Sequence, residues 1–251
     1  MSLANSLQAG QKQTKDKITT IITDTGEIQL SSATVRNYLV NGGGNVTDQE
    51  VKLFIALCSG QKLNPLIKEA YLIKYGTQSA QMVVSKDVYQ KRANKNPNYD
   101  GKKAGVVVLN LQGGVDYREG ALLIEGEKLL GGWCEVYKKN SKVPERVEVS
   151  FDEYVGKKKD GSINNQWATK PATMIRKVAV AQALREAFTE DFQGLYTAEE
   201  MGMDETELTK ESSNMETVYE NINAIPEQSS SPNMTSQQPV YEQVVEDDPM
   251  A

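Results

Sequence analysis

The feature that most limits what this chain can fold into is a change of composition near residue 199. Residues 199–251 hold 13 Asp and Glu against Lys210 alone, a net charge of −12, and their centre reads SSSPNMTSQQP. A segment this polar and charged cannot bury enough apolar surface to offset the entropy lost on ordering. We therefore predict one folded domain over residues 1–198, followed by an acidic, largely disordered tail over residues 199–251.

The predicted domain is basic, although the whole chain is acidic. Residues 1–198 hold 27 Lys and Arg against 21 Asp and Glu, a net charge of +6, whereas the 251-residue chain has a net charge of −6. This asymmetry is typical of proteins that bind nucleic acid or another acidic surface. The N-terminus has no apolar signal-peptide core, and no run of 18 apolar residues occurs. We therefore expect a cytoplasmic protein with no membrane segment.

The periodicity of the sequence predicts an α+β fold, with an antiparallel sheet built of hairpins and with flanking helices. TDQE at 47–50 is a capping box, and apolar residues follow it at helical spacing as far as Gly60. Residues 69–84 read as a hairpin, 86–94 as a short helix after a capping serine, and a last helix is expected after Pro171. Further strands are expected in AGVVVLNL, near GVDYREGALL, in LLGGWCEVYKK and in ERVEVSF. DEYVGKKKDGSINNQ is expected to be a loop or a broken helix.

Several catalytic chemistries lack the residues that they need. The chain has no histidine, which removes His-based triads, His general bases and most catalytic zinc sites. No P-loop sequence occurs, and Cys58 and Cys134 form neither a CxxC motif nor a disulfide framework. We predict no catalytic residue, no metal site and no cofactor, and therefore a binding protein that works without ATP. One enzymatic alternative stays open, a Mg²⁺-dependent nuclease using acidic residues drawn from Asp152, Glu153, Glu186, Glu190 and Asp191.

Lysines and arginines occur in local groups along the predicted domain, and several of them are expected to line one track that binds phosphates. Arg176, Lys177 and Arg185 in the last helix are difficult to explain as core residues, because a buried Arg needs a partner and phosphate fits its planar fork. Alanines on the same helix form a stripe on which a second helix packs or a ligand approaches closely. Trp167 either plugs the sheet or stacks on a base.

Three ordered blocks of the sequence resemble the Bet family of phage recombinases, the λ Red β group, and more distantly the RecT superfamily of single-strand annealing proteins. The blocks are FIALCSGQKLNPLIKEAYLIKYG (54–76), VVSKDVYQKRANKNPNYDG (83–101) and WATKPATMIRKVAVAQALREAFTEDFQGLYTAEE (167–200). The resemblance covers residues 46–200 and is weak over the strands of 104–150. It places phosphate contacts on Lys68, Arg176 and Arg185. Together with the local cation groups, it gives these candidate nucleic-acid-binding residues: Lys68, Lys138, Lys139, Lys158, Lys159, Trp167, Lys170, Arg176, Lys177 and Arg185.

The resemblance implies a protein that binds single-stranded DNA, anneals complementary strands without ATP and assembles into rings or helical filaments. Its implied partners are single-stranded DNA, the annealed duplex, other copies of this chain, a phage 5′–3′ exonuclease and a host single-strand-binding protein. Two alternatives remain besides the nuclease. One is a single-strand-binding protein that does not anneal, and the other is an adaptor whose basic face binds an acidic protein.

Overall fold

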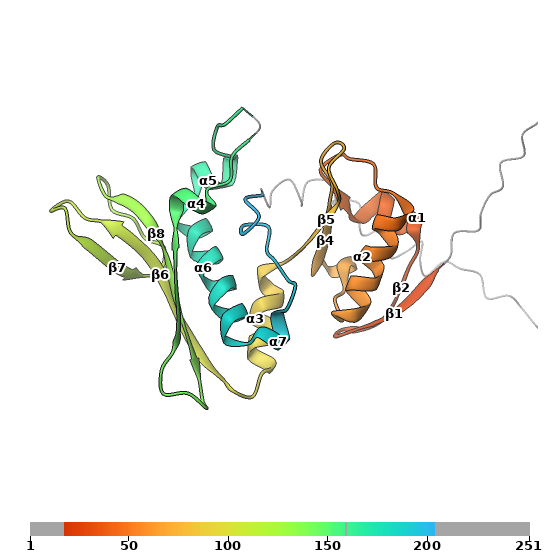
Figure 1. The fold of residues 1–251 in the computed structure, drawn as a ribbon, viewed down its shortest axis with the longest axis horizontal. Helices are drawn as coiled ribbons and strands as arrows, with labels where there is room; N and C mark the ends of the chain where they lie inside the picture. The colour runs from red at the N-terminus through yellow and green to blue at the C-terminus, as the bar shows by residue number, and fades with distance from the viewer. Residues whose placement is uncertain (1–17, 159, 204–251) are drawn as a thin grey trace, which may run out of the picture. The chain divides into compact units, whose positions relative to one another are not determined.

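The computed structural model describes residues 18–158 and 160–203, and all structural statements below concern these residues. The fold is α+β, as predicted, and its strands form three separate sheets (Figure 1). Buried side chains from Ile21 to Leu195 form one continuous hydrophobic cluster. The acidic tail predicted from the composition lies, from residue 204 onward, outside the described residues. None of the described helices combines the length and the apolar character needed to cross a bilayer.

Two of the sheets are small and come from the first part of the chain. β1 and β2 form an antiparallel hairpin, while β4 lies between parallel β3 and antiparallel β5, which confirms the hairpin expected at 69–84. The bounds of these strands are β1 Thr19–Thr23, β2 Gly26–Leu30, β3 Val40–Asn41, β4 Ala70–Ile73 and β5 Gln81–Val84.

The capping box predicted at TDQE begins helix α2 (Asp48–Gly60). The Thr47 side chain accepts a hydrogen bond from the Glu50 backbone N–H at 3.2 Å, and the Glu50 carboxylate accepts one from the Thr47 N–H at 2.7 Å. The buried residues of α2 repeat with helical spacing, which explains why the sequence pattern found this helix. Short helical segments flank it: α1 Ser32–Thr34, η1 Val35–Leu39 and η2 Pro65–Ile67.

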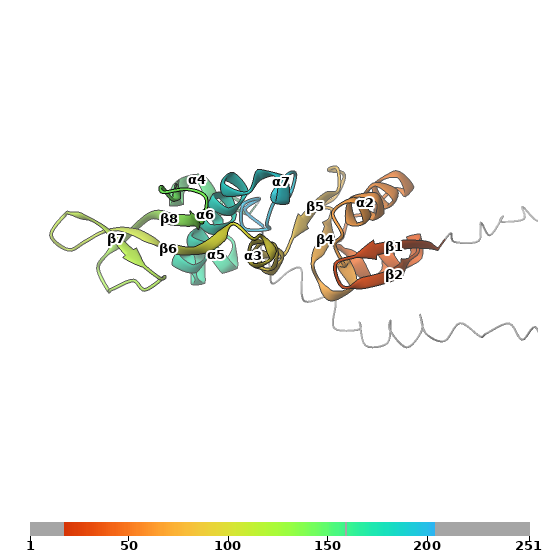
Figure 2. The ribbon, with the colours of Figure 1, turned by 90° about the horizontal axis from the view of Figure 1, so that it is seen from below.

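The third sheet has four antiparallel strands in the order β7-β6-β8-β9, and helix α6 (Pro171–Ala187) packs against β8, β9 and β6 (Figures 1 and 2). A side chain at Gly132 of β8 would lie 2.7 Å from the Ile175 carbonyl oxygen of α6, so only glycine allows this approach of strand and helix. Helix α3 (Lys86–Lys95) contacts both α6 and β6. The bounds of these strands are β6 Tyr99–Leu109, β7 Val115–Glu119, β8 Lys128–Lys138 and β9 Glu145–Ser150.

The rest of the described chain packs around α6. The stretch expected to be a loop or a broken helix contains α4 and α5, joined by a turn in which Lys157 bridges to Ile163. After α7, residues 195–203 run back to the core, where the Val84 N–H donates to the Tyr196 carbonyl at 2.9 Å. Residues 199–203, expected to begin the tail, therefore pack with the folded part. The bounds of these helices are α4 Phe151–Tyr154, α5 Asn165–Thr169 and α7 Thr189–Phe192.

Candidate nucleic-acid interface

A hollow of about 270 Å³ lies where α3, β6 and α6 meet, and cations dominate its wall. Four of its lining residues are Lys or Arg and one is acidic, so the hollow has an excess of positive charge. Such a site favours a phosphate group over a neutral or cationic ligand. Its lining residues are Lys86, Asp87, Tyr89, Gln90, Lys102, Thr173, Arg176, Lys177, Val180 and Ala181.

Arg176 is oriented by the fold without being neutralised by a described carboxylate. Its Nε donates to the Ala104 carbonyl at 3.2 Å, which fixes the side chain against β6, and no described carboxylate forms an ion pair with it. Lys102 donates to the Gln90 side chain of α3. Burial raises the pKa of the Cys134 thiol to about 12, although the charges of Lys102 and Arg176 act in the opposite direction. Both cations therefore lie close enough to Cys134 to influence one buried group.

Lys177 and Arg185, two further predicted residues of α6, have carboxylate partners. Lys177 Nζ lies 2.7 Å from Glu199 Oε1, and Arg185 donates to both oxygens of Glu200. Burial disfavours the charged form of Arg185, but the hydrogen bonds and the negative charge of Glu200 outweigh this effect and raise the pKa of the guanidinium. A phosphate would have to share these cations with the two glutamates or displace them. The partner that the largely buried Arg185 requires is thus the carboxylate of Glu200, from the same chain, rather than a phosphate.

The other predicted cations lie on separate elements. Lys68 has a left-handed backbone conformation after η2, and Lys138 of β8 pairs with Glu145 at 3.5 Å. Lys139 and Lys158 are exposed in turns, and Lys159 lies outside the described residues. Lys170 is exposed one helical turn before Thr173, at the end of the hollow that faces the start of α6. The structure brings Arg176 and Lys177 into one hollow, with Lys170 near it, and the other described candidates do not line this hollow.

Trp167, predicted either to plug the fold or to stack on a base, is buried. Its side chain is 1% exposed in α5 and its ring lies 5.8 Å from that of Phe151. Its Nε1 has no hydrogen-bond partner. Because the side chain is buried, neither face of the ring is open to a base. Stacking on a base would require Trp167 to leave the core. Its packing favours the plug over the stacking platform.

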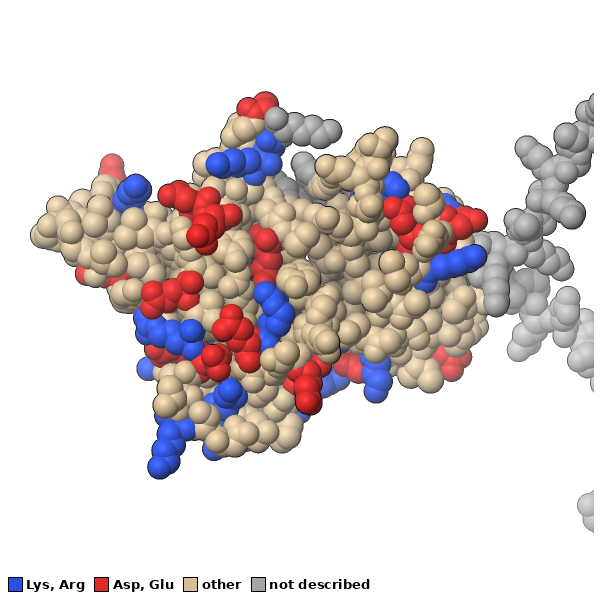
Figure 3. All heavy atoms as spheres, viewed as in Figure 1, with Lys and Arg blue, Asp and Glu red and all other residues tan. Residues whose placement is uncertain are grey.

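Charge on the face drawn in Figure 3 is mixed rather than continuous. On the face drawn in Figure 3, blue Lys and Arg side chains alternate with red Asp and Glu side chains, and no unbroken basic track crosses this face. The sheet residues contribute to this mixture through ion pairs such as Arg146 with Glu135 at 2.6 Å and with Glu148 at 2.9 Å. The candidate interface is therefore local, centred on the hollow.

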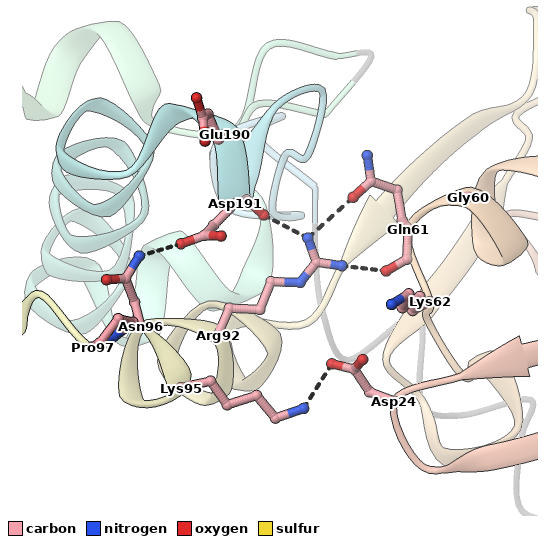
Figure 4. A pocket seen from close by; sticks show the side chains of 10 residues that line it. All are labelled: Asp24, Gly60, Gln61, Lys62, Arg92, Lys95, Asn96, Pro97, Glu190 and Asp191. Carbon is pink, nitrogen blue, oxygen red and sulfur yellow. Dashed lines mark hydrogen bonds and ion pairs between the residues drawn. The ribbon is translucent and has the colours of Figure 1, made fainter.

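A larger hollow, of about 510 Å³, lies beside α3 and is held together by its own side chains (Figure 4). Arg92 donates to the backbone carbonyls of Gln61 and Asp191 and to the Gln61 side chain, and Lys95 pairs with Asp24 at 2.8 Å. Figure 4 shows the contacts from Gln61 and Asp191 converging on the Arg92 guanidinium, with the Lys95–Asp24 pair beside them. These three hydrogen bonds make Arg92 a connection between the end of α2 and α7.

Three residues of the candidate interface, Lys86, Tyr89 and Lys102, were absent from the sequence-based set. Lys102 belongs to a visible basic pair, but only the position of β6 beneath α3 brings it to α6. Lys86 is the first residue of a helix and carries no signal of its own in the sequence. Tyr89 looks like a core residue because its ring is 1% exposed, although its outer edge lines the hollow.

The acidic residues considered for a nuclease lie on α4, at the end of α6 and on α7. Within residues 18–158 and 160–203, no group of three His, Cys, Asp or Glu side chains is placed to hold a metal ion. Asp191 is engaged in the fold, because its carboxylate accepts a hydrogen bond from Asn96 at 2.6 Å. The structure thus adds no support to the nuclease alternative.

Comparison with known proteins agrees with the blocks described above. No curated protein matches the chain. The model of the RecT family matches residues 25–214, which is more than half of the sequence and includes all three blocks. Members of that family act in phage-type recombination as annealing proteins. The chain therefore belongs to the RecT family.

Proposed function

We propose that this protein binds single-stranded DNA and anneals complementary strands without ATP, using the hollow between α3, β6 and α6 to hold phosphates. The observation that carries the proposal is Arg176. Its guanidinium lines a hollow rich in cations, is oriented by the Ala104 carbonyl, and has no carboxylate partner among the described residues. An oriented guanidinium with unused donors binds phosphate well, because its planar fork matches two phosphate oxygens.

The hollow is suited to the backbone of a strand rather than to a particular base. Lys86, Lys102, Arg176 and Lys177 supply charge, whereas Val180 and Ala181 supply a small apolar wall. Phosphate contacts position a strand without reading its sequence. Specificity in annealing then comes from base pairing with the second strand, and the protein contributes charge neutralisation and alignment. No covalent step is required.

A single hollow holds a few nucleotides at most, so annealing requires several copies of the chain in a ring or a helical filament that continues the groove. We propose that residues up to at least 203 form the DNA-binding and oligomerising domain, with the acidic remainder as an appendage. We further propose that it acts in the cytoplasm of a bacterial host, alongside a phage 5′–3′ exonuclease and the host single-strand-binding protein.

The test is an annealing assay without nucleotide. Two complementary oligonucleotides, one with a fluorophore and one with a quencher, are mixed with the protein in the presence of either Mg²⁺ or EDTA. The proposal expects faster quenching than in the absence of protein, and electron microscopy should show rings or filaments on the products. Binding without faster quenching would identify a non-annealing single-strand-binding protein. Shortening of a labelled strand only in Mg²⁺ would identify a nuclease. Failure to bind the oligonucleotides at low salt would favour the adaptor that binds an acidic protein.

A further inference from the structure

The chain after α7 brings two adjacent carboxylates to two cations of α6. Glu199 lies beside Lys177, and Glu200 lies beside Arg185. Both glutamate side chains are almost completely buried, with exposed fractions of 1% and 3%. The two carboxylates are nevertheless stabilised very differently.

Glu200 is fully satisfied. Its oxygens accept hydrogen bonds from both terminal nitrogens of Arg185, at 3.1 and 2.5 Å, and from the Thr197 N–H at 3.0 Å. The Thr197 hydroxyl in turn accepts a hydrogen bond from the Glu200 N–H at 3.3 Å. Bidentate, charge-assisted contacts of this kind are strong and geometrically specific. Glu200 is therefore a permanent part of the fold.

Glu199 is poorly compensated. Neither of its carboxylate oxygens accepts a hydrogen bond, although the Lys177 ammonium lies 2.7 Å from Oε1. Buried carboxylates are normally hydrogen-bonded as well as paired, since one counter-charge alone does not replace the lost hydration. Lys177, unlike Arg185, also lines the basic hollow. The weaker of the two pairs is thus the one that borders the candidate DNA site.

We propose that Glu199 is an exchangeable occupant of the DNA site, which a phosphodiester group replaces beside Lys177 when single-stranded DNA enters the hollow. This inference rests on the proposed function. A phosphate in the hollow offers the ammonium a partner that remains accessible to water, whereas Glu199 offers one that is buried without hydrogen bonds. Glu200 and Arg185 keep their contacts throughout and hold the start of the segment in place.

The exchange has a structural consequence for residues 199–203. Among the described residues, Lys177 is the counter-charge of Glu199. A buried carboxylate that loses such a partner is strongly destabilised, so Glu199 must move into solvent. The backbone at Glu199 and beyond Glu200 then loosens, including the contact of the Gly202 carbonyl with the Asn164 side chain at 2.9 Å. DNA binding and the packing of this segment are therefore coupled, and the coupling acts equally in both directions.

The test compares Glu199→Gln with two variants that remove the same charge elsewhere. Fluorescence anisotropy with a labelled oligonucleotide measures affinity over a range of salt concentrations. We expect Glu199→Gln to bind the oligonucleotide at least about 5-fold more tightly than the wild type at low salt. This factor is the lower end of the usual range for coupling between two sites. Glu125→Gln, at an exposed position that forms no described contact, should bind like the wild type. Glu200→Gln should lose stability without a comparable gain in affinity.

A double-mutant cycle and an exchange measurement on the wild type make the result independent of how Glu199→Gln folds. In a Lys177→Gln background, Glu199→Gln should no longer change affinity. Hydrogen exchange of the wild-type protein should become faster at residues 199–203 when the oligonucleotide is added. An unchanged affinity in Glu199→Gln, or slower exchange in this segment, would overturn the exchange while leaving DNA binding intact. A wild-type protein that binds no oligonucleotide would overturn the proposed function as well.

Discussion

The carboxylate of Glu200 accepts hydrogen bonds from both terminal nitrogens of Arg185, and the Glu200 side chain is only 3% exposed. Arg185 also donates to the Tyr89 hydroxyl at 3.1 Å and lies over the Tyr196 ring, 4.8 Å from its centroid. Arg185, one of the cations that the family resemblance placed on phosphates, is therefore the centre of a network that joins α3, α6 and the segment after α7.

Breaking this pair should destabilise the fold. We expect Glu200→Gln to lower the free energy of unfolding by about 2–4 kcal/mol, because it leaves Arg185 with a neutral partner in a largely buried place. The estimate lies below the full range for buried pairs because the Arg185 side chain is 20% exposed. Urea unfolding at neutral pH measures the change, with Glu125→Gln as the control of equal charge. Equal stability of the two variants would show that the network contributes nothing.

Arg176 should contribute more to DNA binding than its neighbours on α6. Arg176→Gln removes one phosphate contact, which should reduce the slope of log affinity against log salt by about 0.7 for a single strand. Lys128→Gln makes the same change of charge at an exposed position, where β8 begins, and should leave the slope unchanged. If the two variants reduce the slope equally, only the net charge matters and the hollow is not the site.

Trp167 should behave as a core residue. Trp167→Ala should lower the free energy of unfolding by about 3–5 kcal/mol, the usual cost of removing a buried aromatic side chain. Affinity for single-stranded DNA per folded molecule should stay the same, since no ring face is open to a base. Thermal unfolding followed by circular dichroism measures stability, and anisotropy below the melting temperature measures affinity. A loss of affinity in a protein of normal stability would restore the stacking interpretation.

Glu50 should make the protein sensitive to acid. Hydrogen bonds from Lys74 and from the backbone N–H groups of Thr47 and Ala80 lower the pKa of Glu50 from 4.5 to about 2. A carboxyl group with a lowered pKa in the folded state stabilises the protein above pH 4.5, and this stabilisation is lost as pH falls toward 2. The urea midpoints of the wild type and of Glu50→Gln should therefore differ at pH 6 and converge near pH 2. A difference that does not depend on pH would contradict this.

Local signals in the sequence predicted most of the secondary structure. The capping box at Thr47, the capping role of Ser85, and Pro171 at the start of α6 each act within a few residues of the chain, so they could be recognised without the fold. The β1–β2 hairpin was not predicted, although DTG between two alternating segments is a turn signal. The short helix α5, which contains Trp167, was not predicted either; Asn164 caps it by accepting a hydrogen bond from the Trp167 N–H.

The candidate site was less predictable because its contacts join distant parts of the chain. The sequence shows that Arg185 needs a partner, but it does not show that Glu200 provides one, since the segment after α7 must first return to α6. For the same reason the acidic character of residues 199 and 200 indicated the start of a tail, whereas the structure buries both side chains as counter-charges. Composition describes the average of a segment, so it could not show that Glu199 and Glu200 pack into the folded part.

The acidic chain beyond residue 203 should compete with DNA for the basic domain. Residues 204–251 hold 11 Asp and Glu against Lys210, a net charge of −10, and a tethered segment has a high effective concentration near the domain that carries it. Truncation should follow Met203 rather than Ala198, because Glu199 and Glu200 are needed for the ion pairs of α6. We expect the truncated protein to anneal normally and to bind single-stranded DNA more tightly at low salt. The advantage should largely disappear near 0.5 M salt, where the Debye length is about 4 Å. Loss of annealing in a folded truncated protein would make the tail part of the annealing machinery. If the truncated and full-length proteins bind single-stranded DNA equally at every salt concentration, the tail does not compete with DNA and its remaining role is to dock another protein.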